Sequence, residues 1–192
     1  MTLDMVAVLF GGVVAMLPVF ADKVLNVGEV GFGWMRAMPA IGSICMGLIL
    51  ALRPPINRGG RTILLTVFVF GVATTVFGLS QSFAISLIAL FTLGAADNIS
   101  VVIRQTVLQL MTPDSMRGRV TAVSVIFIGS SNELGEFESG VAAKLMGLVP
   151  SVVFGGVMSL LSVPAVAALF PQLLRLGSLE HLQPADPAEQ EV

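Results

Sequence analysis

The stretch that decides the fold runs from Leu93 to Gly140 and reads LGAADNISVVIRQTVLQLMTPDSMRGRVTAVSVIFIGSSNELGEFESG. Two long apolar runs flank a short basic turn, Thr112–Arg119, and both runs also carry charged residues. A charge near the centre of a bilayer costs about 2.5–3.5 kcal/mol, so such side chains usually face a protein interior or a water-filled path. The stretch therefore predicts a membrane helix hairpin with one polar side.

The composition of the 192-residue chain is that of a polytopic membrane protein. It is 55% hydrophobic and only 11% charged, with a mean hydropathy of +0.94, whereas soluble domains carry about 25% charged residues. A net charge of -2 offers no basic surface to nucleic acid. The single cysteine, Cys45, and the single histidine, His181, leave no disulfide framework and no metal-binding cluster. We therefore predict no cofactor and no metal, and, without a Ser/His or Cys/His pair, no enzyme.

Six segments are apolar over the roughly 20 residues that a spanning helix needs. They are expected at about residues 2–20, 31–52, 62–79, 83–104, 120–145 and 151–170. The first is not a cleaved signal peptide, because its first basic residue, Lys23, follows the apolar run. Residues 1–174 thus form one six-helix domain. The acidic, proline-containing tail, residues 175–192, is predicted to be disordered.

Basic residues orient these helices, because cytoplasmic loops of membrane proteins carry an excess of Lys and Arg. One side receives Arg53, Arg58, Arg61, Arg104, Arg117, Arg119 and Arg175. The other side holds only Lys23, Arg36 and Lys144. The sequence predicts a multi-pass protein of the cell membrane with both termini in the cytoplasm.

Small residues recur along the expected helices, where they allow the close helix contacts on which packing in lipid depends. They include Gly12, Gly42, Gly47, Gly71, Gly78, Gly94, Gly129, Gly135, Gly140 and Gly156. We interpret all of them as packing residues. Pro39 and Pro164 lie inside expected helices and are predicted to kink them.

The fourth segment has a polar face. Asp97 and Arg104 are seven residues apart, which places them on one face about 10 Å apart along the axis, and Asn98 widens it. Asp97 either faces a cavity or forms a structural pair within the bundle. We expect Arg104 to reach the cytoplasmic surface and Arg36 of the second segment to reach the outer one. If Arg36 faces inward, it can pair with an acid of the fourth or fifth segment.

Acidic residues mark the fifth segment. Glu133 and Glu136 follow Asn132 and are about 60° apart around the helix, so they share a face from which Glu138 points away. Two neighbouring carboxylates in a poorly hydrated place raise each other's proton affinity, as a proton carrier requires. The alternative is that this part of the helix reaches the outer water and the glutamates are merely solvated.

Two short loops are the most distinctive patterns. One is Asn57-Arg58-Gly59-Gly60-Arg61 and the other is Pro113–Arg119, which includes Arg117, Gly118 and Arg119. Arginines at cytoplasmic helix ends can meet the negative ends of helix dipoles or acids on neighbouring helices, and so latch a closed state. If these arginines only set the membrane topology, that role would explain their positive charge, but it would not explain the Gly-Arg spacing.

These loops resemble the D-R-x-G-R and P-x-x-x-R-G-R signatures of a six-helix half of a major facilitator superfamily transporter. The runs LDMVAVLFGGVVAMLPVFA, LGAADNISVVIRQTVLQL, TPDSMRGRV and IGSSNELGEFESG resemble more closely its transmembrane secretion effector branch, which includes enterobactin exporter-like proteins. The likeness covers about Leu3 to Leu174. It implies an all-α C-terminal half, a 3+3 helix bundle, in which the cytoplasmic gate falls on the loop residues above and Arg104.

The resemblance also implies function. Such carriers move a small-molecule substrate through a path between two six-helix halves, so this chain is expected to need an N-terminal half or a second copy of itself. Proton-coupled efflux is expected, with Asp97, Asn98, Asn132, Glu133 and Glu136 along the path. Asn57 stands where the superfamily usually has an aspartate, which removes one charge from the latch. The competing interpretation is a truncated or transport-incompetent membrane scaffold.

Overall fold

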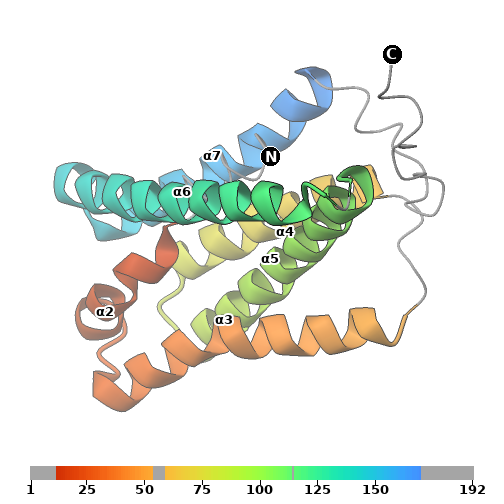
Figure 1. Cartoon of the computed structure of the whole chain (residues 1–192). Helices are drawn as coiled ribbons and strands as arrows, with labels where there is room; N and C mark the ends of the chain where they lie inside the picture. The colour runs from red at the N-terminus through yellow and green to blue at the C-terminus, as the bar shows by residue number, and fades with distance from the viewer. Residues whose placement is uncertain (1–11, 54–58, 114, 170–192) are drawn as a thin grey trace.

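The computed structural model of the chain describes residues 12–53, 59–113 and 115–169 (Figure 1). Within these ranges it contains six α-helices: α2 (Val13–Lys23), α3 (Gly28–Ala51), α4 (Gly59–Leu79), α5 (Phe83–Met111), α6 (Arg117–Met146) and α7 (Leu148–Leu169). Four of them, α3, α4, α5 and α7, are long and apolar enough to cross a membrane. The all-helical fold is thereby confirmed, and a lipid bilayer is its environment.

The other two helices differ for separate reasons. Helix α2 has 11 described residues, and the start of the first expected span lies outside the described part of the chain, as do Asn57, Arg58 and the tail. Helix α6 is 30 residues long. Six charged side chains interrupt its apolar sequence: Arg117, Arg119, Glu133, Glu136, Glu138 and Lys144. Its polarity sets α6 apart from the four apolar helices.

Several helices extend beyond the apolar runs that predicted them. Four begin at Gly28, Gly59, Arg117 and Leu148, rather than at residues 31, 62, 120 and 151. Helix α5 continues to Met111, so Arg104 lies inside the helix and does not end it. Hydropathy marks the part of a helix that lipid surrounds, whereas backbone hydrogen bonds carry the helix on into the polar flanks.

The best-packed part of the molecule consists of α3 against α5 and of α4 against α5 and α7. At the first contact, a Cβ atom on Gly42 would overlap the Phe91 carbonyl oxygen, and one on Gly94 would overlap the Pro39 carbonyl oxygen. The Ser43 hydroxyl donates a hydrogen bond to the Gly94 carbonyl at 3.1 Å. Glycine therefore lets these two backbones touch, and a short polar contact adds to the packing.

An apolar core fills one end of the bundle, where α2 and α4 end and α7 begins. Its centre is the contact between the rings of Phe20 and Phe77, whose centroids are 4.6 Å apart. Leu17, Met35 and Leu90 are also fully buried there. At this end the chain reverses from α6 to α7 through one residue, Gly147, whose φ of 94° favours glycine.

Helix α6 lies at the edge of the bundle, where it contacts mainly α7 and α2 (Figure 1). Only Ser124, Ser131 and Gly135 are buried along its length. A Cβ atom added at Gly129 or Gly140 would meet nothing within 4 Å. The packing role predicted for these two glycines is therefore wrong within the described chain, because no helix lies against them.

Candidate functional site: an acid-lined cavity

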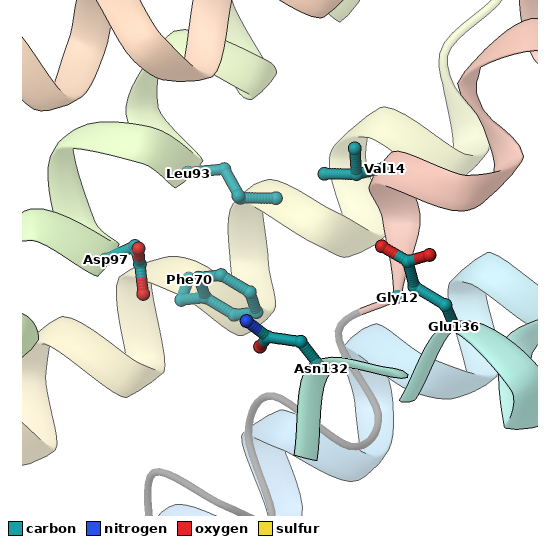
Figure 2. Close-up of a pocket in the computed structure, with 7 residues that line it drawn as sticks. All are labelled: Gly12, Val14, Phe70, Leu93, Asp97, Asn132 and Glu136. Carbon is teal, nitrogen blue, oxygen red and sulfur yellow. The ribbon is translucent and has the colours of Figure 1, made fainter. Parts of the chain in front are cut away.

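A cavity of about 220 Å³ opens where α2, α4, α5 and α6 face one another. Seven residues line it: Gly12, Val14, Phe70, Leu93, Asp97, Asn132 and Glu136 (Figure 2). Three of them carry polar side chains, and the walls between are apolar. A mostly apolar cavity with a few convergent polar groups is the usual form of a small-molecule site.

Helical periodicity explains how the polar groups reach this cavity. Leu93 and Asp97 are four residues apart on α5, and Asn132 and Glu136 are four residues apart on α6, so each pair shares one face of its helix. Helix α4 adds Phe70. Residues that are distant in the sequence thus converge because two helices turn one polar stripe each toward the same space.

The two carboxylates lie apart from each other. In Figure 2, Asp97 and Glu136 stand at opposite ends of the lined space, with the Phe70 ring and the Asn132 amide between them. Asp97 is half-buried, whereas Glu136 is exposed. The site therefore offers two separate acidic groups, one half-buried and one exposed, to a proton or to a positively charged group.

The apolar core lies directly beyond this cavity along α2. Gly12 and Val14 line the cavity at the start of the helix, whereas Phe20 packs into the core near its end. Leu93 of α5 belongs to both, since it lines the cavity and is buried in the core cluster. One end of the cavity is therefore closed by packed apolar side chains.

Two predicted path residues do not line the cavity. Glu133 is exposed, and it points about 60° away from Glu136 around α6. Asn98 faces α3 instead, because a Cβ atom on Gly47 would lie 3.6 Å from its Oδ1 atom. That Oδ1 atom is buried and has no hydrogen-bond partner in the described part of the chain.

The described gate residues lie in the first turns of α4 and α6, except Arg104, which lies inside α5. Gly60 is buried in the first turn of α4, beside the exposed Arg61, and Arg104 is half-buried in α5. Arg117, Gly118 and Arg119 are exposed in the first turn of α6. The Arg117 Nε donates to the Thr112 carbonyl at 3.4 Å, which ties the turn between α5 and α6 together. Asn57 and Arg58 lie outside the described residues.

Sequence reasoning missed four of the lining residues, namely Gly12, Val14, Phe70 and Leu93. Apolar side chains on a membrane helix look alike whether they face lipid, the core or a cavity, so no signal distinguished them. Among the described residues, no group of three or more His, Cys, Asp or Glu side chains could hold a metal ion.

Comparison with known proteins shows the family of this chain. The model of a family described as transmembrane secretion effector matches residues 5–191. The chain belongs to this family. The match confirms the resemblance to major facilitator superfamily transporters. Together with four helices that are long and apolar enough to cross a membrane, the family indicates membrane transport. A search of curated proteins returned no match to this chain.

Proposed function

We propose that the chain is one lobe of a two-lobed, proton-coupled exporter of small molecules in the cell membrane. The lobe is the six-helix domain, residues 1–174, arranged as two sets of three helices. Both termini lie in the cytoplasm, and the cargo crosses chemically unchanged. The substrate path runs along the cavity and is completed by a second lobe.

The cavity carries this proposal. It brings Asp97 of α5 and Glu136 of α6 to one partly apolar space inside a membrane protein. Ionisable groups in such a place are expensive to maintain and commonly mark ion or proton pathways. A carboxylate there can take up a proton from one side and release it on the other when its access to water changes.

The uneven packing of the helices supports alternating access. The core around Phe20 and Phe77 closes one end of the cavity, whereas α6, which carries Glu136, is held by few buried residues. A shift of a loosely packed helix needs less disruption of contacts than a shift of α5, which is fixed on both sides. Movement of α6 is the step we expect to change the exposure of Glu136.

The test uses the purified chain in lipid vesicles. Vesicles are loaded with members of a panel of small organic solutes, and release is followed with and without an imposed pH gradient. The wild-type chain should release at least one solute faster when the gradient is present. Asp97→Asn and Glu136→Gln should each remove this response, because neither substituted side chain can bind and release a proton.

Glu133→Gln is the matched control, since it removes a carboxylate from the same helix but not from the cavity. It should keep the response of the wild type. The proposal fails if no solute responds to the gradient, or if both cavity variants respond as the wild type does. An equal loss in all three variants would transfer the role from the cavity to the acidic side chains of α5 and α6 in general.

A further inference from the structure

The lining of the cavity favours positive charge. Among the described residues that line it are two carboxylates, Asp97 and Glu136, and one amide, Asn132, but no lysine, arginine or histidine. An anion in this space would meet two like charges and a single donor side chain. A cation would meet two opposite charges, whose attraction is stronger in a poorly hydrated place than in water. The lining therefore selects cations over anions.

The half-buried carboxylate lies far from both ends of its helix. Asp97 is about 21 Å from each end of α5, and Phe70 of α4 is about 17 Å from the first residue of its helix and about 14 Å from the last. Both helices are long and apolar enough to cross a membrane. A carboxylate at this depth needs a proton or an opposite charge. Because no basic side chain lines the described part of the cavity, a bound cation can supply that charge.

An aromatic ring adds a second feature that attracts cations. Figure 2 shows the Phe70 ring between Asp97 and Asn132 in the lined space. The face of such a ring attracts an ammonium group that lies within about 6 Å of the ring centre. Phe70 is half-buried and packs against the apolar core, which holds the ring in place. The ring and the Asp97 carboxylate can therefore act on one positive group.

The size of the cavity limits the part of a ligand that this chain can hold. Its volume is about 220 Å³. An apolar cavity of about 150 Å³ is large enough for benzene, whereas drug-sized ligands occupy about 300–1,000 Å³. The apolar side chains of Val14 and Leu93 belong to the same lining. The cavity therefore fits an ammonium group with a short apolar body, and a larger body extends beyond it.

We infer that the cargo of this carrier is an organic cation, with its ammonium group against the Phe70 ring and beside the Asp97 carboxylate. Its apolar part contacts Val14 and Leu93. The inference rests on the proposed exporter and names its substrate class. Phe70 is then the residue that sets specificity for an organic cation, because hard metal ions such as Mg²⁺ and Ca²⁺ need about six or more oxygen ligands, which a ring face and apolar walls do not provide.

Equilibrium binding to the full chain tests this inference, in an uncharged detergent at neutral pH and without any gradient. The probe is labelled phenyltrimethylammonium, whose charge is permanent, and protein-free micelles give the blank. Two compounds of similar shape are compared with it. They are tert-butylbenzene, in which carbon replaces the charged nitrogen, and benzenesulfonate, which is an anion. The cation should bind saturably and about tenfold or more tighter than tert-butylbenzene, and benzenesulfonate should not bind.

Two variants remove the two features separately. Asp97→Asn keeps the shape of the side chain and should weaken binding of the cation about tenfold or more, but not that of tert-butylbenzene. Phe70→Leu removes the ring and should weaken binding of the cation about fivefold to thirtyfold. Phe70→Tyr keeps an aromatic ring and should bind the cation as the wild type does. This last variant separates loss of the ring from damage to the fold.

The controls are the same residue types outside the cavity. Glu133 is exposed on α6, and Phe68 of α4 is 48% exposed; neither lines the cavity. Glu133→Gln and Phe68→Leu should therefore bind the cation as the wild type does. Absence of saturable binding would overturn the inference, as would equally tight binding of tert-butylbenzene. Unchanged binding in Asp97→Asn or Phe70→Leu, or an equal loss in the controls, would also overturn it.

This inference and the proposed exporter fail separately, because binding is measured without a gradient. A chain that binds the cation but shows no gradient-driven release would keep the cation site and lose the exporter. A chain that releases only neutral or anionic solutes in response to the gradient, and does not bind the probe, would keep the exporter and lose the cation as its cargo.

Discussion

Glycine residues have opposite surroundings in two regions of this bundle. Where α3 crosses α5, Gly42 and Gly94 sit against the opposing backbone, with no room for a methyl group. Along α6, Gly129 and Gly140 face space in which a methyl group would touch nothing within 4 Å. The first region is closed by its own chain. The second is open.

Helices α3 and α5 form a closely packed frame, whereas α6 is a helix with few buried residues. Helices α3 and α5 hold each other by backbone contact, and α5 in turn holds Asp97 in place. Helix α6, which carries Glu136 into the cavity lining, is restrained by few contacts. The proposed carrier uses both, since Asp97 stays where the frame puts it while the surroundings of Glu136 change.

The largest effect should follow Gly94→Ala, which would break the closed region. The added methyl group overlaps the Pro39 carbonyl oxygen and would lie 2.6 Å from the Pro39 Cα atom. Backbone atoms cannot rotate away, so the helices must separate. We expect the free energy of unfolding in detergent to fall by about 3 kcal/mol.

Thermal unfolding in the same detergent measures this loss. Gly129→Ala is the matched control from the open region, and it should be neutral or stabilising by up to about 1 kcal/mol, because alanine favours a helix more than glycine does. Equal losses in the two variants would erase the distinction between the regions.

A smaller effect is expected at the crossing of α4 and α7. A Cβ atom on Gly156 would lie 2.8 Å from the Thr75 backbone nitrogen, and would also overlap the Thr75 hydroxyl. The hydroxyl can rotate, and the nitrogen needs to move by only a few tenths of an ångström. Gly156→Ala should therefore cost about 1–2 kcal/mol of unfolding free energy, less than Gly94→Ala. A cost as large as that of Gly94→Ala would show that this second crossing is equally closed.

The same contrast shows what the sequence could and could not predict. The spacing of apolar residues predicted an all-helical membrane protein, because lipid forces every spanning segment to satisfy its own backbone. Asp97, Asn132 and Glu136 stood out as candidates, because a charge or an amide in an apolar run is chemically conspicuous. Their meeting at one cavity required the arrangement of α5 and α6 in space.

Other features could not be read from the sequence at all. Gly94 and Gly129 both sit in helical, mostly apolar surroundings, and nothing local tells which of them meets another backbone. Glu133 and Glu136 differ by 60° around one helix, and only the neighbours of α6 decide which of them lines the cavity. Phe70 carries no chemical signal, since its role follows from the face that α4 turns inward.

The smallest effect should come from Ser43→Ala, which removes a polar contact from the closed region but leaves its shape intact. The Ser43 hydroxyl donates to the Gly94 carbonyl at 3.1 Å across the two helices. Hydrogen bonds between membrane helices contribute about 0.6 kcal/mol on average, because the separated helices find other partners. Ser43→Ala should lower the unfolding free energy by about that amount, whereas Ser130→Ala on exposed α6 should not change it. A loss several times larger would mean that this hydrogen bond, and not the contact of two backbones through glycine, holds α3 on α5.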